Sequence, residues 1–140
     1  MSSVCRLLVC GGREFTDFRL ILSVLSRLSP SLVIEGGARG ADTGARVAAG
    51  KLGIQVREFP ADWARFGRRA GYLRNEQMLA EGHPDMVVAF PGGPGTASMV
   101  RLARQAGVPV RVIVSAQAFF EKKVCKETLQ ENSVKEVSRV

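Results

Sequence analysis

This chain contains several glycine-rich segments whose backbone could bind phosphate. One of them is Pro91-Gly92-Gly93-Pro94-Gly95-Thr96, which follows an apolar run and precedes a helix-compatible segment. Glycine lets the backbone turn sharply and approach a ligand, and the amides that begin a helix lack intrahelical partners at the positive end of its dipole. A bound anion satisfies those amides, and the Thr96 hydroxyl adds a donor. The expected chemistry is phosphate binding; the alternative is a tight turn without a ligand.

Two more glycine pairs favour the phosphate interpretation. Gly11-Gly12-Arg13 follows the first predicted strand, and Gly36-Gly37-Ala38-Arg39-Gly40-Ala41-Asp42 follows the second. In a parallel sheet these strand ends share one edge, where ligands of open α/β sheets bind. Neither segment is a GxGxxG fingerprint with an acidic residue at the ribose-binding position. We therefore expect a phosphate-binding crevice of another design, lined by all three glycine pairs.

The elements that must position these loops alternate between strand and helix periodicity. Apolar runs predict strands, and apolar stripes of helical period or small-residue segments predict helices between them. The predicted strands are residues 4–10, 31–35, 54–59, 86–90 and 110–114, and the predicted helices are residues 17–28, 41–52, 69–81 and 96–106. Helical crossovers between strands imply a Rossmann-like open parallel sheet of about five strands with helices on both faces.

Composition limits the classes of protein to which this chain can belong. The chain has 140 residues, 46% of them hydrophobic, which suits one soluble domain. No apolar run approaches a membrane span, and residues 1–10 do not resemble a signal peptide, so we expect a cytoplasmic protein without a membrane partner. The three cysteines, Cys5, Cys10 and Cys125, lack CxxC spacing and are expected to be reduced thiols in or near a core. No metal site and no cofactor is expected.

Charge divides the chain into two parts. The net charge of +7 allows a nucleic-acid partner or a small anionic ligand. Lysines gather after residue 120, where basic and acidic residues alternate and nearly cancel. We therefore expect a nucleotide-binding domain at residues 1–115 and a charged helix or tail at 116–140, with DNA binding disfavoured. The sequence is compatible with a homo-oligomer and does not set the oligomeric state.

Several side chains allow both a ligand-binding and a structural role. Arg13 could bind phosphate or pair on the surface with an acidic neighbour, and we favour phosphate. Asp42 could complement a helix N-terminus or accept a ribose hydroxyl, with neither favoured. Trp63 could stack on a base, although packing is the favoured role. Arg65, Arg68 and Arg69 form either a solvated cluster or part of the anion field. Three residues are expected outside the site, His83 in a turn and Arg101 and Arg104 facing solvent.

Together these motifs resemble a known superfamily. Gly11-Gly12-Arg13, Glu35 to Asp42, Arg74-Asn75 and the PGGxGT run at residues 91–96 look like the SLOG superfamily of Rossmann-like domains, and within it the YspA-like group. That superfamily is similar to LOG-type phosphoribohydrolases and to the DprA/Smf domains that bind DNA. The resemblance covers about residues 4–115. It implies binding of a nucleotide or nucleotide-derived molecule, often in stress or conflict systems of bacteria and phages.

One position departs from the enzymes of this superfamily. LOG-type enzymes carry PGGxGTxxE, and their glutamate works with an upstream arginine to cleave the N-glycosidic bond of a nucleoside monophosphate. Here Met99 occupies the glutamate position, whereas Arg74 matches the arginine. A thioether cannot stabilise the positive charge that develops on the ribose, although Asp42 or Glu35 could supply a carboxylate.

We therefore favour a non-catalytic module that senses or sequesters a nucleotide. The alternatives are a LOG-type hydrolase, in which Arg74 and Asp42 are the candidate catalytic residues, and DprA-like DNA binding. The candidate ligand-binding residues are Gly11, Gly12, Arg13, Gly36, Gly37, Ala38, Gly40, Asp42, Arg74, Asn75, Pro91, Gly92, Gly93, Gly95 and Thr96.

Overall fold

The computed structural model describes residues 5–115, which form a five-stranded parallel sheet. The strands are β1 (Arg6–Cys10), β2 (Leu32–Glu35), β3 (Gln55–Glu58), β4 (Met86–Ala89) and β5 (Val110–Val112). Their spatial order is β3-β2-β1-β4-β5, so the strand order reverses between β1 and β4. This Rossmann-like α/β architecture confirms the predicted fold class. The predicted C-terminal helix or tail and Cys125 lie outside the described residues.

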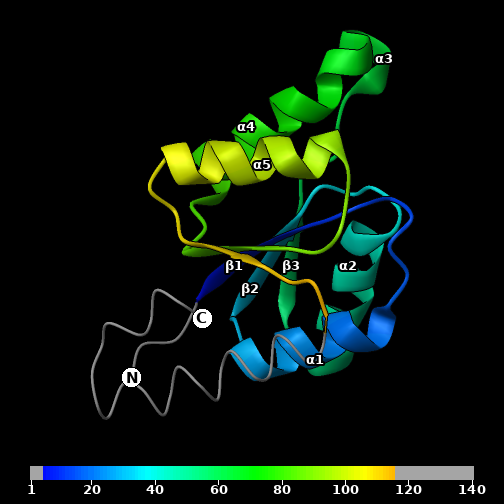
Figure 1. The fold of residues 1–140 in the computed structure, drawn as a ribbon, viewed down its shortest axis with the longest axis vertical. Helices are drawn as coiled ribbons and strands as arrows, with labels where there is room; N and C mark the ends of the chain where they lie inside the picture. Colours follow the sequence, from blue (N-terminus) through cyan, green and yellow to red (C-terminus); the bar gives the residue numbers. More distant parts are fainter. Residues whose placement is uncertain (1–4, 116–140) are drawn as a thin grey trace.

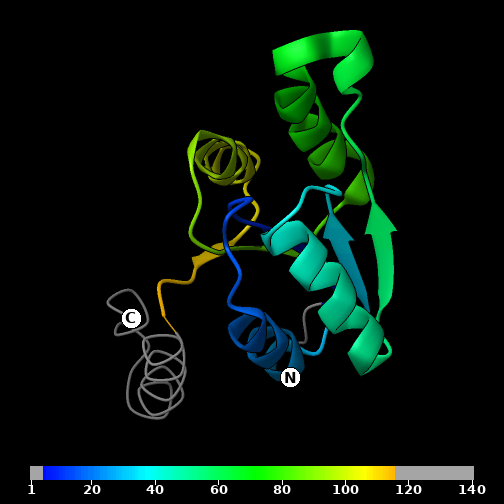
Figure 2. The same ribbon diagram turned by 90° about the vertical axis from the view of Figure 1, so that its right-hand side faces the viewer.

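Helices cover both faces of the sheet (Figures 1 and 2). Helices α1 (Phe18–Leu28) and α2 (Ala41–Leu52) pack on one face, whereas α4 (Ala70–Gly82) and α5 (Pro94–Gln105) pack on the other. Because strand side chains alternate between faces, Leu7 and Val9 join the first core and Leu8 and Cys10 the second. The first core includes the small-residue face of α2, which lets that helix approach the sheet closely.

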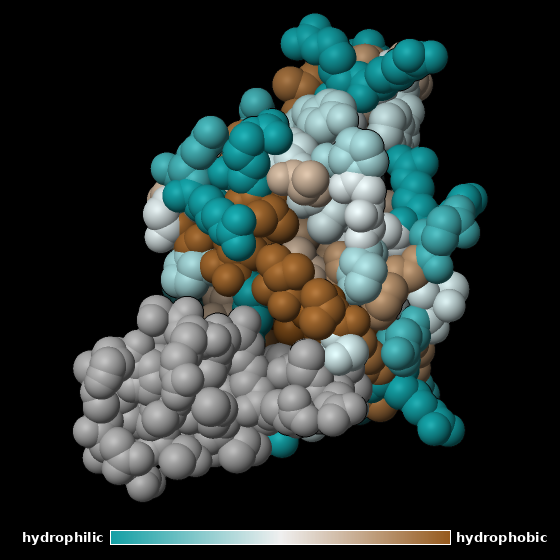
Figure 3. Space-filling view, in the orientation of Figure 1, coloured by the Kyte–Doolittle hydropathy of each residue, from teal (hydrophilic) through white to brown (hydrophobic). Residues whose placement is uncertain are grey.

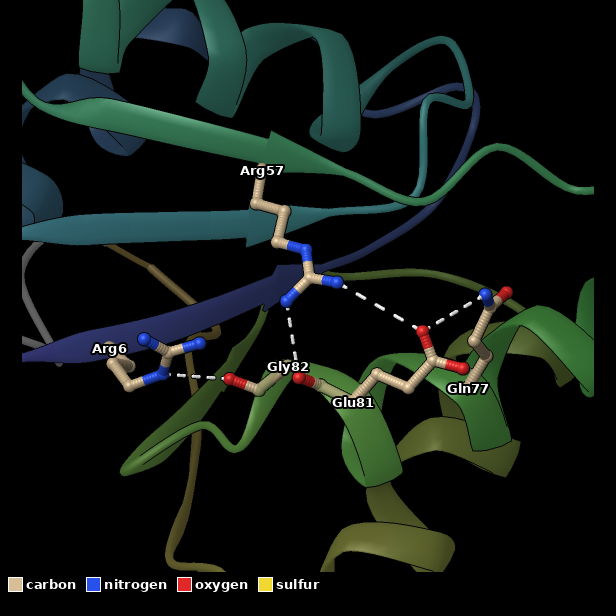
Figure 4. Close-up of polar contacts among 5 residues, drawn as sticks. All are labelled: Arg6, Arg57, Gln77, Glu81 and Gly82. Carbon is tan, nitrogen blue, oxygen red and sulfur yellow. Dashed lines mark hydrogen bonds and ion pairs between the residues drawn. The ribbon is translucent and has the colours of Figure 1, made fainter.

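Arginine side chains fix the C-terminal end of α4 against the sheet. Arg6 on β1 donates from Nε to the Gly82 carbonyl at 2.8 Å, and Arg57 on β3 donates to the Glu81 carbonyl at 3.2 Å. Figure 4 shows both guanidinium groups reaching this helix end, where Arg57 also faces the Glu81 carboxylate. The last carbonyls of a helix lack intrahelical partners, so these arginines satisfy them and fix the position of α4.

The connection from β3 to α4 contains structure that the sequence did not reveal. Helix α3 (Trp63–Phe66) and the 3₁₀ turn η1 (Gly67–Arg69) occupy it and project beyond the sheet edge (Figure 2). Asp62 begins α3 by accepting a hydrogen bond from the Arg65 amide at 3.1 Å, and Gly67 ends it with φ of +59°. A single turn of helix is too short to produce a periodic apolar pattern.

Other differences concern element ends and two side chains. Helix α5 begins at Pro94 instead of Thr96, because proline suits the first position of a helix. The left-handed residue that ends α4 is His83, at φ of +49°, so His83 is a turn residue as predicted and Gly82 is still helical. Cys10 is buried, but Cys5 is exposed, which corrects its predicted placement near a core. No helix within residues 5–115 has the length and apolarity needed to cross a bilayer.

Candidate functional site

A cavity of about 380 Å³ lies at the carboxyl edge of the sheet, beside the reversal in strand order between β1 and β4. Its wall combines the loops after β1, β2 and β4 with α3 and α4. The lining residues are Cys10, Gly11, Gly12, Arg13, Ala38, Asp42, Trp63, Arg68, Gly71, Tyr72, Arg74, Asn75, Met78, Gly93, Pro94, Gly95 and Thr96. Asp42 is the only acidic residue among them, whereas Arg13, Arg68 and Arg74 are basic, so basic groups outnumber acidic ones in a lining that is otherwise largely glycine and apolar residues.

The loops after β1 and β4 are joined directly. The Gly12 amide donates to the Pro91 carbonyl at 2.8 Å, and the Phe90 amide donates to the Cys10 carbonyl at 2.9 Å. At Gly92 a β-carbon would overlap the Thr96 hydroxyl and lie 2.7 Å from the Gly12 nitrogen. Glycine is therefore required at Gly92 so that the two loops can touch across the reversal in strand order.

The N-terminus of α5 faces the cavity. Gly93 is its N-cap residue, Pro94 occupies the first turn, and no side chain in the described part of the chain caps the helix. Asn75 on α4 donates from Nδ2 to the Gly95 carbonyl at 3.3 Å, which holds this first turn in place. The open amides and the Thr96 hydroxyl therefore line the cavity as a set of donors at the positive end of a helix dipole.

The loop after β2 is held by two acidic side chains. Asp42 accepts hydrogen bonds through Oδ2 from the amides of Gly36 and Ala38, both at 3.2 Å. Asp42 lies in the first turn of α2, which is the helix N-terminal role considered from the sequence, and it also satisfies the backbone of the loop before that helix. Burial raises the pKa of Asp42, and the Ala38 amide and the Arg74 charge oppose that rise. Asp42 nevertheless lines the cavity.

Glu35 lies beneath the same loop and is completely buried. Its Oε1 accepts a hydrogen bond from the Gly37 amide at 2.5 Å, whereas its Oε2 has no hydrogen-bond partner within residues 5–115. Burial, together with the negative charges of Asp42 and Glu58, raises the pKa of Glu35 from 4.5 to about 7. Glu35 is absent from the cavity lining, so it supports the loop from behind.

Arg74 connects α4 to the loop after β2. Its guanidinium donates to the Gly36 carbonyl and, at 3.2 Å, to Oδ1 of Asn75, and a β-carbon on Gly36 would collide with it. Burial lowers the pKa of Arg74 and the Asp42 charge opposes that fall, so the group stays a cation. The site therefore has a fixed, half-buried positive charge opposite the N-terminus of α5.

Arg13 and Trp63 meet at the rim of the cavity. The Arg13 guanidinium carbon lies 5.1 Å from the centroid of the Trp63 ring, within the range of a cation–π contact. Trp63 is 46% exposed, and the edge of its ring packs over Gly71 on α4. The surface alternative for Arg13 is also not seen, because Glu14 pairs instead with Arg39 at 2.7 Å.

Ten of the fifteen predicted ligand residues line the cavity. They are Gly11, Gly12, Arg13, Ala38, Asp42, Arg74, Asn75, Gly93, Gly95 and Thr96. Gly36, Gly37 and Gly40 do not, because they pack against Arg74, Glu58 and the backbone of the first loop, respectively. Pro91 and Gly92 line a second groove beside α5, and Figure 3 shows apolar side chains gathered on that side of the molecule. All three glycine pairs follow strands at one edge, but the expectation that all three line one cavity is wrong, because Gly36, Gly37 and Gly92 lie outside its lining.

The sequence reasoning missed several lining residues. Gly71, Tyr72 and Met78 on α4 contribute to the wall. Gly71 lies three residues before Arg74 and Met78 lies four residues after it, so both share one face of α4 with Arg74. Extending that helical face along the sequence would have predicted Gly71 and Met78 as lining residues. Arg101 and Arg104 are exposed as expected. Arg65 stacks on Phe66 at 4.9 Å and lies outside the cavity lining, so the arginine cluster contributes only Arg68.

Met99 belongs to the core beneath α5. It is completely buried with Met78, Ala89 and Ala103 and does not line the cavity. Burial and the Asp42 charge raise the pKa of the Cys10 thiol at the cavity floor to about 12, which favours its protonated form. Within residues 5–115, no three His, Cys, Asp or Glu side chains gather as a metal site would require. The arrangement is suited to holding an anion.

Comparisons with known proteins agree with this architecture. A family model described as YspA, cpYpsA-related SLOG family matches residues 5–66. The Gene 61 protein of Mycobacterium phage D29 is 38% identical over 117 residues, covering 75% of this chain and 93% of that protein. The X-ray structure of DNA processing protein A (DprA) from Streptococcus pneumoniae matches at 17% identity with a TM-score of 0.62. That match covers 92% of this chain but only 57% of DprA, and it shows a shared fold. On the family model and the phage relative, this chain belongs to the YspA, cpYpsA-related SLOG family.

Proposed function

We propose that this protein binds a nucleotide or a nucleotide-derived ligand in the cavity and acts as a sensor or sequestering module. The observation that carries the proposal is the convergence of the N-terminus of α5 with Arg13 and Arg74 on one cavity. Backbone amides at a helix N-terminus and arginine guanidinium groups are the donors that phosphate prefers. The phosphate of the ligand would lie against Gly93, Gly95 and Thr96.

The rest of the cavity suits the nucleoside portion. Its volume of about 380 Å³ falls within the ~300–1,000 Å³ typical of small-molecule sites, which leaves room beyond a bare phosphate. Asp42 supplies an acceptor for hydroxyl groups, and Trp63 and Tyr72 supply aromatic surface at the rim. Together these groups favour a ligand with a phosphate, a sugar and a planar base.

Thermal unfolding with a ligand panel tests the proposal. A ligand at a hundredfold excess over its dissociation constant stabilises the native state by about 2.7 kcal/mol. We expect AMP, GMP, NAD or ADP-ribose to raise the melting temperature, and Arg13→Ala to reduce that rise. Arg39→Ala is the matched control, because Arg39 is a surface arginine outside the cavity lining. No rise with any of the four ligands would contradict nucleotide binding.

A LOG-type hydrolase is the second candidate, and the position of Asp42 favours it. Asp42 lines the cavity together with Arg74, so a carboxylate and a cation face the same space although Met99 is buried. Against this candidate, Oδ2 of Asp42 already accepts two backbone hydrogen bonds. Release of free base from a nucleoside monophosphate, lost in Asp42→Asn, would establish the hydrolase.

A further inference from the structure

Exposed aromatic side chains concentrate around the cavity. Within the described residues the exposed large aromatics are Trp63, Phe66 and Tyr72, at 46%, 37% and 45% exposure, and two of the three line the cavity. Aromatic rings lose favourable free energy when they remain in water, so a pair at one rim indicates a surface that a planar ligand covers.

Helix α3 and its capping contacts place Trp63 in this position. Asp62 caps the first turn, and the Gly67 amide donates back to the Trp63 carbonyl, so both ends of the four-residue helix are fixed. The ring edge packs over Gly71 on α4, where a β-carbon would lie 3.4 Å from Cη2 of the ring. Trp63 is therefore held from its own helix and from α4, while nearly half of its surface remains open to solvent.

Arg13 covers part of this ring from a fixed base. The backbone beside Arg13 is held in place, because the Gly12 amide donates to the Pro91 carbonyl and the Gly12 carbonyl accepts from the Ala41 amide. Gly40 also packs against the carbonyls of Gly12 and Arg13. The guanidinium makes no salt bridge within residues 5–115 and rests on Trp63. The side chain is thus attached beside the phosphate-binding loops while its charge is held at the aromatic rim.

We propose that Trp63 is the stacking platform for the base of the ligand, and that Arg13 covers the ring only in the free protein. On binding, the guanidinium turns from Trp63 to the phosphate and the base takes its place on the ring. The inference rests on the proposed nucleotide-binding function and specifies its ligand class, a phosphate ester that carries an aromatic base.

The exchange follows from the relative strength of the contacts. A cation–π contact at an exposed site is weak, whereas a charge-assisted hydrogen bond from arginine to phosphate is strong and can be bidentate. Base stacking on an aromatic side chain then replaces the contact that Trp63 loses. A sugar phosphate without a base would draw Arg13 away and leave the ring uncovered, so it would gain less from this site.

The single tryptophan of the chain makes the exchange directly observable. We expect AMP and GMP to quench Trp63 emission with the same saturation curve as the calorimetric heat, and ribose 5-phosphate to bind without quenching. Trp63→Ala should weaken the affinity for AMP or GMP about tenfold or more and leave that for ribose 5-phosphate nearly unchanged. Phe66→Ala is the matched control, because Phe66 is an exposed aromatic on the same helix outside the cavity lining.

The outcomes separate the two proposals. Heat on adding AMP or GMP, without quenching and with unchanged affinity in Trp63→Ala, would overturn the stacking role alone. The absence of heat from AMP, GMP, NAD and ADP-ribose would overturn the proposed function and this inference with it. Equal loss of affinity in Trp63→Ala and Phe66→Ala would assign the effect to the fold of α3 and also overturn the stacking role.

Discussion

The loops after β2 and β4 both carry a glycine pair, but the protein uses them in opposite ways. In the loop after β2, side chains of the protein already hydrogen-bond to the backbone. Asp42 accepts from the amides of Gly36 and Ala38, Glu35 accepts from the Gly37 amide, and Arg74 donates to the Gly36 carbonyl. In the loop after β4, residues 91–95 are exposed and no side chain in the described part of the chain caps the helix that follows.

The comparison shows that a glycine pair after a strand does not by itself mark a ligand site. The β2 loop uses glycine so that the Arg74 side chain can approach its backbone. The β4 loop uses glycine so that its backbone can touch the β1 loop and leave donors open to the cavity. The β2 loop is therefore a structural support whose hydrogen bonds come from the protein itself, and the β4 loop is the proposed anion site.

The largest expected effect is the loss of the acceptor within the β2 loop. Asp42→Ala leaves the amides of Gly36 and Ala38 without their partner, and an unsatisfied buried amide costs about 1–3 kcal/mol. We predict that the free energy of unfolding falls by about 3–4 kcal/mol in denaturant titrations. Asp42→Asn, which keeps an acceptor oxygen, should retain most of the stability. Equal losses in the two variants would mean that the charge and not the acceptor holds the loop.

The second effect is a dependence of stability on pH that arises from the β2 loop and not from the β4 loop, since residues 91–96 carry no ionisable side chain. The pKa of Glu35 is raised from 4.5 to about 7 in the folded protein, so the native state binds its proton more tightly than the unfolded state. Its contribution to stability is therefore complete below pH 4.5 and is lost as the pH rises to about 7.

Denaturant titrations from pH 4.5 to 8 measure this loss, which we expect to be on the order of 3 kcal/mol. Asp42 adds a slope of the same sign, because its pKa is also raised. Glu35→Gln should therefore flatten the profile without abolishing the slope entirely. A wild-type profile that rises with pH over this range would contradict the buried position of Glu35.

The third effect separates two neighbouring glycines of the β4 loop. A β-carbon on Gly92 would meet the Gly12 nitrogen and Thr96, whereas one on Gly93 would meet nothing within 4 Å. We predict that Gly92→Ala lowers the free energy of unfolding by about 1–3 kcal/mol, as overpacking does. Gly93→Ala should change it by less than about 0.5 kcal/mol. Thermal melts of the two variants measure this difference. Similar losses of stability in Gly92→Ala and Gly93→Ala would contradict the described contact between the loops.

Sequence periodicity predicted nearly all of the fold. The apolar runs and the helical stripe of Leu20, Ile21, Val24 and Leu25 are local signals, and the structure places those side chains in the core. Helix α3 was missed because one turn gives no period, and its capping residues Asp62 and Gly67 also suit a loop. The start of α5 was missed although Pro94 offered a signal, since proline favours the first turn of a helix.

The candidate site was predicted only as far as local signals reach. Strand ends located the edge, which is why Gly11, Gly93 and Thr96 were found. The collision between a β-carbon on Gly36 and the Arg74 guanidinium depends on how α4 sits against the β2 loop, and sequence spacing does not encode that distance. The exposure of Trp63 likewise depends on how α3 is placed, which the sequence did not reveal.

The central claim is that the cavity binds a nucleoside monophosphate and does not cleave it efficiently. Loss of one electrostatic stabiliser of a transition state costs ~10²- to 10³-fold in rate, while binding survives better. Titration calorimetry with AMP and GMP, followed by chromatography of the same samples for free adenine or guanine, tests both halves. We predict saturable heat, weakened in Arg13→Ala, with no base released beyond the protein-free control. No heat, or rapid base release that Arg74→Ala or Asp42→Asn abolishes, would contradict the claim.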